Sequence, residues 1–142
     1  METSARNVFC GKVVKVNSGA VNDEVELAVE GGLSIVASIT KVSTNNLGLK
    51  PGAEAMALIK ASFVLLMNDA DKYLLSTRNQ FAGTVSKVTP GAVNAEVIVD
   101  LPGGASIASI VTMGSIAKLG LAPGKKVTAI VKASQVILAV PK

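Results

Sequence analysis

The sequence predicts an all-β protein built from two tandem copies of one small five-stranded barrel, each copy with a single short helix. Three observations lead to this prediction. Shifted by 72 residues, Ser4 to Leu66 matches Ser76 to Leu138 without a gap, with 31 identities in 63 positions. Stretches rich in β-branched residues alternate with turns rich in Gly, Asn and Pro. One stretch in each copy lacks this alternation and ends at a glycine, as short helices often do.

The first copy shows its expected elements in a simple order. The strands are expected at residues 8–16, 24–29, 33–40, 53–60 and 63–67. Asn17-Ser18-Gly19 and Glu30-Gly31-Gly32 favour tight turns between the first three strands. Lys41 to Leu47 is the expected helix, with Gly48 as its C-cap. Five strands with a short helix between the third and the fourth are the outline of an OB-like barrel.

The repeat also predicts the domain organisation. We expect one domain at residues 1–68 and a second at residues 73–142. The junction Asn68-Asp69-Ala70-Asp71-Lys72 is a polar turn, too short to be a flexible linker. A unit of about 65 residues is marginally stable alone, so packing between copies or chains is expected.

The residue types exclude most catalytic chemistry. The chain has no histidine, the commonest general base and a common metal ligand. Its single cysteine, Cys10, corresponds to Ala82 in the second copy, so we expect it to be a small core residue. Only Glu24 and Glu96 among the ten acids occupy matching positions, which gives neither an acid–base pair nor a cation cage. The protein is therefore expected to be no enzyme and to hold no cofactor or protein-ligated metal.

Composition also predicts where the protein is found. The longest apolar runs, such as Phe63 to Met67, are too short to span a bilayer. The first residues contain no apolar segment typical of a secretory signal. One cysteine allows no internal disulfide, which suits a reducing compartment. We expect a cytoplasmic protein without membrane contact.

The polar residues kept in both copies are mostly hydroxyls and cations. The only two arginines, Arg6 and Arg78, occupy one repeat position, whereas the twelve lysines are scattered. The guanidinium is a planar fork that suits oxyanions. A site made of Arg, Lys, Ser, Thr and backbone N–H supplies donors without acceptors. Such a site favours a fully deprotonated tetrahedral dianion over protonated phosphate.

Each of these positions also has a purely structural interpretation. Arg6 and Arg78 can pair with an acid across an interface, and Lys60 and Lys132 can be solvated strand residues. Ser and Thr at strand ends often form turns, and the Gly-Ala-Val-Asn loop can be a turn in which Asn takes a positive φ. The joint repetition of the donors favours the binding hypothesis.

Three motifs resemble the molbindin family, whose unit is the Mop domain. They are Ser-Ala-Arg-Asn at residues 4–7, Gly-Ala-Val-Asn-x-Glu-Val at 19–25 and Lys-Ala-Ser at 60–62. Over almost the whole chain the tandem arrangement resembles the di-Mop molbindins, although Thr77 stands in the second copy where Ala5 stands in the first. The resemblance implies OB-like barrels that bind molybdate or tungstate between Mop units, in homotrimers of tandem chains.

The resemblance also implies site residues. The main oxyanion site uses the first-strand serine and arginine of one unit, with the hydroxyls around the short helix and the Lys-Ala-Ser segment of a neighbour. Here these residues are Ser4, Arg6, Thr40, Ser43, Lys60, Ala61 and Ser62, and Ser76, Arg78, Thr112, Ser115, Lys132, Ala133 and Ser134. A second type of site is assigned to the loops Gly19, Ala20, Val21 and Asn22, and Gly91, Ala92, Val93 and Asn94.

The donor residues predict a protein that binds a tetrahedral oxyanion, and the resemblance implies that this is molybdate or tungstate, bound for storage or homeostasis. No phosphate loop is present, and the chain has no room for a helix-turn-helix. The alternative is an OB protein that binds single-stranded nucleic acid, which needs aromatic residues for base stacking. Only Phe9 and Phe81 are repeated aromatics, and both are expected in the core. We therefore expect no nucleic-acid partner.

Overall fold

Two short helices and ten strands form in the computed structural model, which describes residues 1–142. The first repeat contains β1 (Asn7–Ser18), β2 (Asn22–Val29), β3 (Ser34–Thr40), α1 (Lys41–Leu47), β4 (Glu54–Ile59) and β5 (Leu65–Met67). The second contains β6 (Asn79–Pro90), β7 (Asn94–Asp100), β8 (Ser106–Thr112), α2 (Met113–Leu119), β9 (Lys126–Val131) and β10 (Ile137–Ala139).

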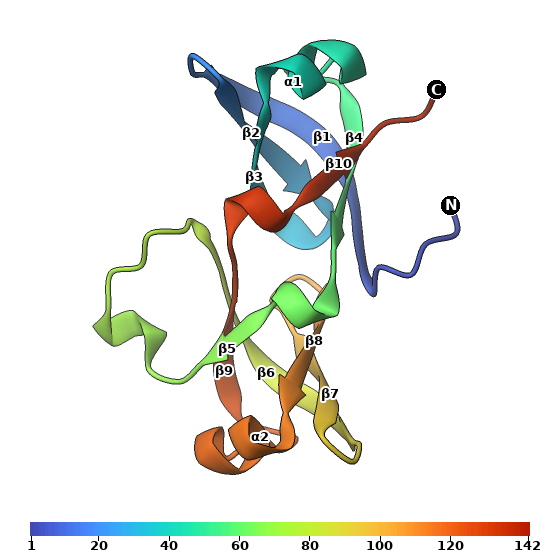
Figure 1. Cartoon of the computed structure of the whole chain (residues 1–142). Coiled ribbons are helices and arrows are strands. Elements are labelled where there is room, and N and C mark those ends of the chain that lie inside the picture. The colour runs from blue at the N-terminus through green and yellow to red at the C-terminus, as the bar shows by residue number, and fades with distance from the viewer.

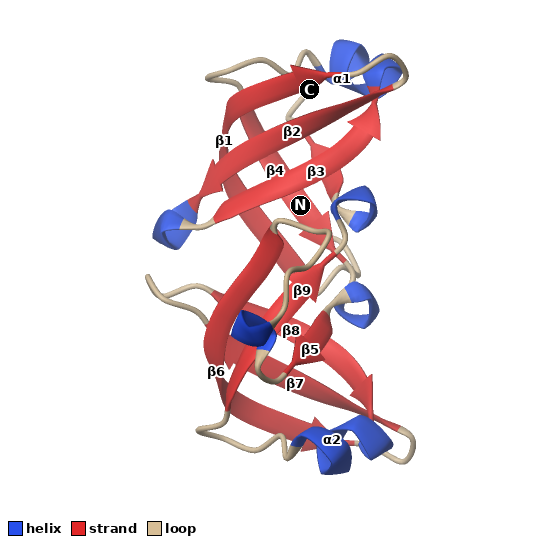
Figure 2. Cartoon of the chain, turned by 90° about the vertical axis from the view of Figure 1, so that its left-hand side faces the viewer, coloured by secondary structure: helices blue, strands red, loops and turns tan.

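The strands form two antiparallel five-stranded sheets that lie end to end (Figure 1). In the first sheet β1 pairs with both β2 and β4, and β2 pairs with β3. The second sheet repeats this pattern with β6, β7, β8 and β9. Figure 2 shows the two helices at opposite ends of the molecule. The predicted fold class of two tandem OB-like units, each with one short helix, is confirmed.

The fifth strand of each repeat joins the sheet of the other repeat. β5 pairs with β9, and β10 pairs with β4 (Figure 1). The chain crosses between the sheets at two 3-10 turns, Ala61–Phe63 and Ala133–Gln135, which contact β8 and β3 respectively. The sequence repeats and the folded sheets therefore have different boundaries, because each sheet contains residues of both repeats.

Local signals set the ends of the helices. The Thr40 hydroxyl accepts a hydrogen bond from the Ser43 N–H at 3.1 Å and so caps the N-terminus of α1. Gly48 ends this helix with a φ of +64°, in the left-handed region that favours glycine. The helix bounds agree with the expected residues 41–47. Neither helix is long and apolar enough to cross a membrane.

Two buried asparagines join the repeats at equivalent positions. The Asn7 amide donates to the Ala108 carbonyl at 2.9 Å and accepts from the Ala108 N–H at 2.8 Å. Asn79 makes the same two contacts with Val36. Around these contacts the apolar side chains of both repeats form one continuous core. The repeats are therefore packed against each other as a single body.

Strand alternation decides which residues of β1 face this core. Phe9 and Val13 point inward, and a bulge between Val13 and Lys15 shifts the register beyond them. Cys10 is one residue out of phase with Phe9 and is exposed. The prediction that Cys10 is a core residue is therefore wrong.

Candidate anion-binding site

Strand pairing places the repeated arginine beside the repeated lysine. In the second sheet Asn79 of β6 lies opposite Val131 of β9. Arg78 immediately precedes Asn79 and Lys132 immediately follows Val131, so the two cations flank the same end of an antiparallel pair. The first sheet has the same register 72 residues earlier. The arginine and lysine of each candidate site therefore lie at the same position of the sheet in both repeats.

Arg78 and Lys132 line one cavity of about 570 Å³. Three other predicted site residues, Ser76, Ala133 and Ser134, line the same cavity. The first repeat contributes Glu24 from β2 and Ser38 from β3. The cavity therefore lies where the two repeats meet, with cations and hydroxyls on one side and a carboxylate on the other.

A second cavity of about 420 Å³ adjoins the first, because Ser38 and Ser134 line both. Thr40 and Ser43 line this second cavity. The Thr40 hydroxyl donates to the Ser43 Oγ at 2.8 Å, which leaves the Ser43 hydroxyl hydrogen free to bind an anion. The structure thus brings seven predicted residues along one groove: Thr40, Ser43, Ser76, Arg78, Lys132, Ala133 and Ser134.

Most of the equivalent residues on the other side are also exposed. Ser4, Arg6, Lys60, Ser62 and Thr112 are exposed, Ser115 is half-buried and Ala61 is buried. Lys60 differs from Lys132, because its ammonium lies 5.5 Å from the centre of the Phe63 ring, whereas Gln135 stands at the equivalent position. In the single chain these donors face solvent, so another surface is needed to shield a bound anion from water.

The structural interpretation of the arginines, pairing with an acid across an interface, is seen in the structure, although the sequence analysis did not name the acids. Arg78 forms an ion pair with Glu24, and Arg6 forms one with Glu96, each time from one repeat to the other. The sequence did carry a signal, because Glu24 and Glu96 are the only acids at matching positions of the two repeats. Ser38 carried no such signal, because its counterpart is Ile110.

The Gly-Ala-Val-Asn loops lie at the outer ends of the molecule, beside α1 and α2 (Figure 1). The Gly19 N–H donates to the Asn22 carbonyl at 2.9 Å, and the second loop has the same contact at 2.8 Å. Asn22 lines the second cavity. The remaining residues of the two loops are all exposed: Gly19, Ala20, Val21, Gly91, Ala92, Val93 and Asn94. A second type of site at these loops stays a prediction.

Asp23, next to this groove, is a buried carboxylate found only in the first repeat. Hydrogen bonding with the Thr44 side chain is the largest influence and lowers the pKa of Asp23, while burial acts in the opposite direction. The Gly19 N–H at 3.3 Å and the Lys41 ammonium at 3.4 Å lower the pKa further. The equivalent residues in the second repeat are Ala95, Ile116 and Met113. These contacts therefore stabilise one repeat and are no part of a repeated site.

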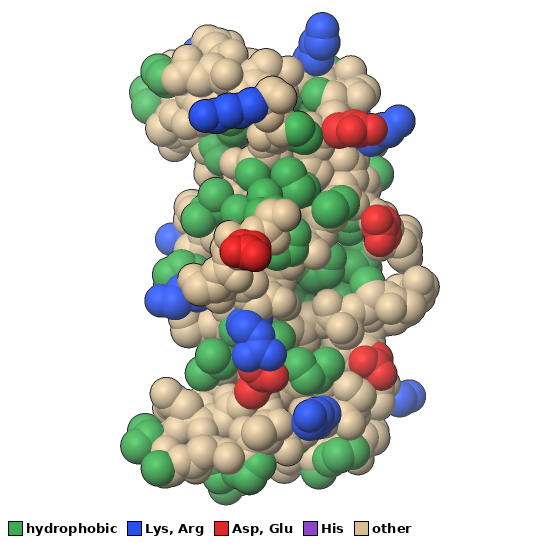
Figure 3. Space-filling model, turned by 90° about the vertical axis from the view of Figure 1, so that its right-hand side faces the viewer, with side chains coloured by type: hydrophobic (Ala, Val, Ile, Leu, Met, Phe, Trp, Pro, Cys, Tyr) green, Lys and Arg blue, Asp and Glu red, His purple; other side chains and the backbone are tan.

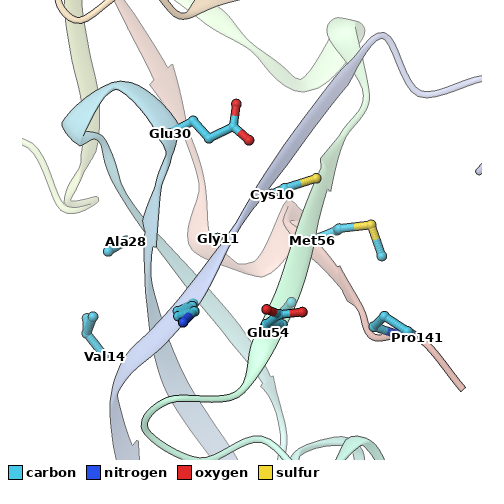
Figure 4. Close-up of a pocket in the computed structure, with 10 residues that line it drawn as sticks. Cys10, Gly11, Val14, Ala28, Glu30, Glu54, Met56 and Pro141 are labelled. Atoms are coloured by element: carbon cyan, nitrogen blue, oxygen red, sulfur yellow. The ribbon is translucent and has the colours of Figure 1, made fainter.

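A separate cavity lies on the outer face of the first sheet, around Cys10 (Figure 4). In this view Glu30 and Glu54 lie above and below Cys10, with Met56 beside it. Two carboxylates make this cavity unfavourable for an anion. Its Cys10, Glu30 and Glu54 side chains do not form a group that could hold a metal ion.

The repeated aromatics offer no platform for base stacking. Phe81 is buried in the core, and Phe9 is half-buried against it. Bases stack on exposed aromatic faces in single-stranded nucleic-acid sites. The arrangement does not favour the nucleic-acid alternative.

Two segments of the chain, residues 3–66 and 75–138, match the TOBE domain. The molybdenum-pterin-binding protein MopA of Rhodobacter capsulatus is 49% identical over 141 residues, which are 99% of this chain and 53% of MopA. The molybdenum transport protein ModE of Herbaspirillum seropedicae is 44% identical over 140 residues, which are 99% of this chain and 52% of that ModE. The chain spans about half the length of the curated relatives it matches.

A solved structure is similar over the whole chain. The cytoplasmic molybdate-binding protein ModG, in a form with molybdate bound, matches with a TM-score of 0.96 and 49% sequence identity. The match covers 99% of this chain and 100% of that one. The similarity therefore extends over both repeats.

Proposed function

The chain belongs to the TOBE-domain family, and from that premise we propose that it binds molybdate and tungstate as intact oxyanions, without chemical change. The relatives support this proposal by name, because MopA is a molybdenum-pterin-binding protein and ModG a molybdate-binding protein. These names describe binding proteins, and the donor groups of the groove suit binding alone. We place the role in cytoplasmic storage or homeostasis of molybdenum.

One observation carries the proposal: Arg78 and Lys132 lie side by side at the end of one strand pair, with Ser76 and Ser134 in the same cavity. Two cations and two hydroxyls provide several hydrogen-bond donors for the oxygens of a tetrahedral dianion. Thr40 and Ser43 extend this set from the other repeat. The equivalent set on the first-repeat side is Ser4, Arg6, Lys60, Ala61, Ser62, Thr112 and Ser115.

The proposed working form is a homotrimer, in which residues 1–68 and 73–142 act as two binding units per chain. The edge strands support this assembly, because Leu65 on β5 and Ile137 on β10 are each about two-thirds exposed at equivalent positions. Figure 3 shows hydrophobic side chains gathered over the middle of one face. Exposed apolar edge strands favour subunit contacts. A covering subunit would also shield the donor groups from water.

Titration calorimetry tests this function directly. We expect tight binding of molybdate and tungstate and much weaker binding of sulfate and phosphate. Native mass spectrometry of the same samples should give a mass about three times the 14.4 kDa of the chain. Sulfate affinity equal to that of molybdate would contradict selective binding, and a monomer that binds molybdate would contradict sites completed by a second chain.

A further inference from the structure

Both arginines of the donor set are already bound to a carboxylate in this structure. Arg6 binds Glu96 through both terminal nitrogens, with Nη2 donating to Oε1 at 2.9 Å. Arg78 binds Glu24 through Nη2. Because each pair joins one repeat to the other, the same carboxylate position faces both candidate sites. The end of the guanidinium that suits an oxyanion is therefore occupied by an internal anion.

Glu24 is itself one of the residues that line the candidate site. It lines the same cavity as Arg78 and Lys132. A dianion in this cavity would meet a like charge at the glutamate and an arginine whose Nη2 is already bound to that glutamate. Neither Lys60 nor Lys132 is held by an acid in this way. The lysines are thus free to receive an anion, whereas the arginines must first be released.

We propose that Glu24 and Glu96 are internal competitors that the oxyanion displaces, a role that rests on the proposed function. In the empty site each glutamate holds its arginine in place, and bound oxyanion takes over the guanidinium. The glutamates thereby set the concentration of oxyanion at which the site fills. Displacement is feasible because the pairs are open to solvent, with 53% and 55% of the two arginine side chains exposed. Exposed ion pairs of this kind are weak.

A purely structural role for the pairs makes a different prediction. If the glutamates only tie the repeats together, their loss should lower stability and leave anion affinity unchanged or reduced. The buried Asn7 and Asn79 contacts already join the repeats, so we expect little change in stability. The affinity for molybdate therefore distinguishes a competing role of the glutamates from a purely structural one.

The test compares Glu24→Gln/Glu96→Gln with Glu26→Gln/Glu54→Gln, using molybdate calorimetry at low salt. The control makes the same change in net charge at acids that bind no arginine. We expect the first variant to bind molybdate about two- to fivefold more tightly than the control, the range that an exposed ion pair accounts for. Thermal melts should agree within experimental error.

The two possible failures are distinguishable. If the wild type binds molybdate but Glu24→Gln/Glu96→Gln binds no more tightly than the control, competition is overturned and the proposed function stands. If the wild type does not bind molybdate, the proposed function is overturned, and the displacement inference with it.

Discussion

Asn79 binds the backbone of Val36 in the other repeat as a neighbouring strand would. Its amide nitrogen donates to the Val36 carbonyl at 2.7 Å, and its amide oxygen accepts from the Val36 N–H at 2.8 Å. The side chain is fully buried. One side chain thus satisfies two backbone groups that would otherwise be unpaired in the core of the joint.

Asn79→Ala is expected to destabilise the protein strongly. The substitution leaves the Val36 N–H and carbonyl buried without partners, at about 1–3 kcal/mol each, so the free energy of unfolding should fall by about 2–6 kcal/mol. Urea unfolding measures the change. Asn46→Ala, at an exposed position of α1, is the control and should cost less than about 1 kcal/mol. Equal effects in both variants would contradict the role assigned to Asn79.

Gly103→Ala is expected to disturb the joint where two turns meet. A Cβ at Gly103 would lie 2.0 Å from the Gly31 carbonyl oxygen of the first repeat. Gly104 is the matched control, because its φ of +93° is similar but a Cβ there would meet nothing within 4 Å. Gly104→Ala should cost about 1 kcal/mol for the left-handed backbone, and Gly103→Ala about 1–3 kcal/mol more for the overlap. Thermal unfolding that ranks the two variants equally would show that the turns separate freely.

The Asp23 contacts should make stability depend on pH in acid. Because folding lowers the pKa of Asp23 below its ordinary 3.8, the unfolded state binds a proton more readily than the folded state. The stabilisation is therefore complete above about pH 4 and is lost as pH falls through the folded pKa. We expect the wild type to exceed Asp23→Asn in melting temperature at pH 7, and the gap to narrow near pH 3. Asp71→Asn, an exposed control, should show no gap at either pH. A constant gap for Asp23→Asn would contradict the lowered pKa.

Lys132→Ala should weaken one class of oxyanion site and leave the Lys60 class intact. Removing a charged donor from an anion shielded by the assembly costs about 2–5 kcal/mol, or about 30-fold or more in affinity. Molybdate titration should therefore show half of the sites weakened. Lys126→Ala, at an exposed position of β9, the strand that ends just before Lys132, is the control for net charge. Unchanged affinity and stoichiometry in Lys132→Ala would remove this residue from the site.

Much of the candidate site could be predicted from the sequence because the repeat marks the same donor positions twice. Arg6 and Arg78 stand out as the only arginines, and strand pairing places them beside the lysines of the repeated Lys-Ala-Ser segment. The glutamate partners could not be assigned, since an ion pair between residues 54 positions apart depends on how the two sheets pack. Ser38 was missed because the second repeat has no hydroxyl at that position.

The sequence by itself determined the two copies, the strand order within each copy and the two helices. These features depend on local signals: alternation of β-branched residues, the Thr40 cap and the glycine that ends α1. Only the tertiary structure decided that β5 and β10 change places between the sheets. The two repeats have nearly the same sequence there, Leu65-Leu66 against Ile137-Leu138, so each strand suits either sheet edge. Which sheet each strand joins depends on the path of the chain through the preceding 3-10 turn, and no local sequence pattern predicts that path.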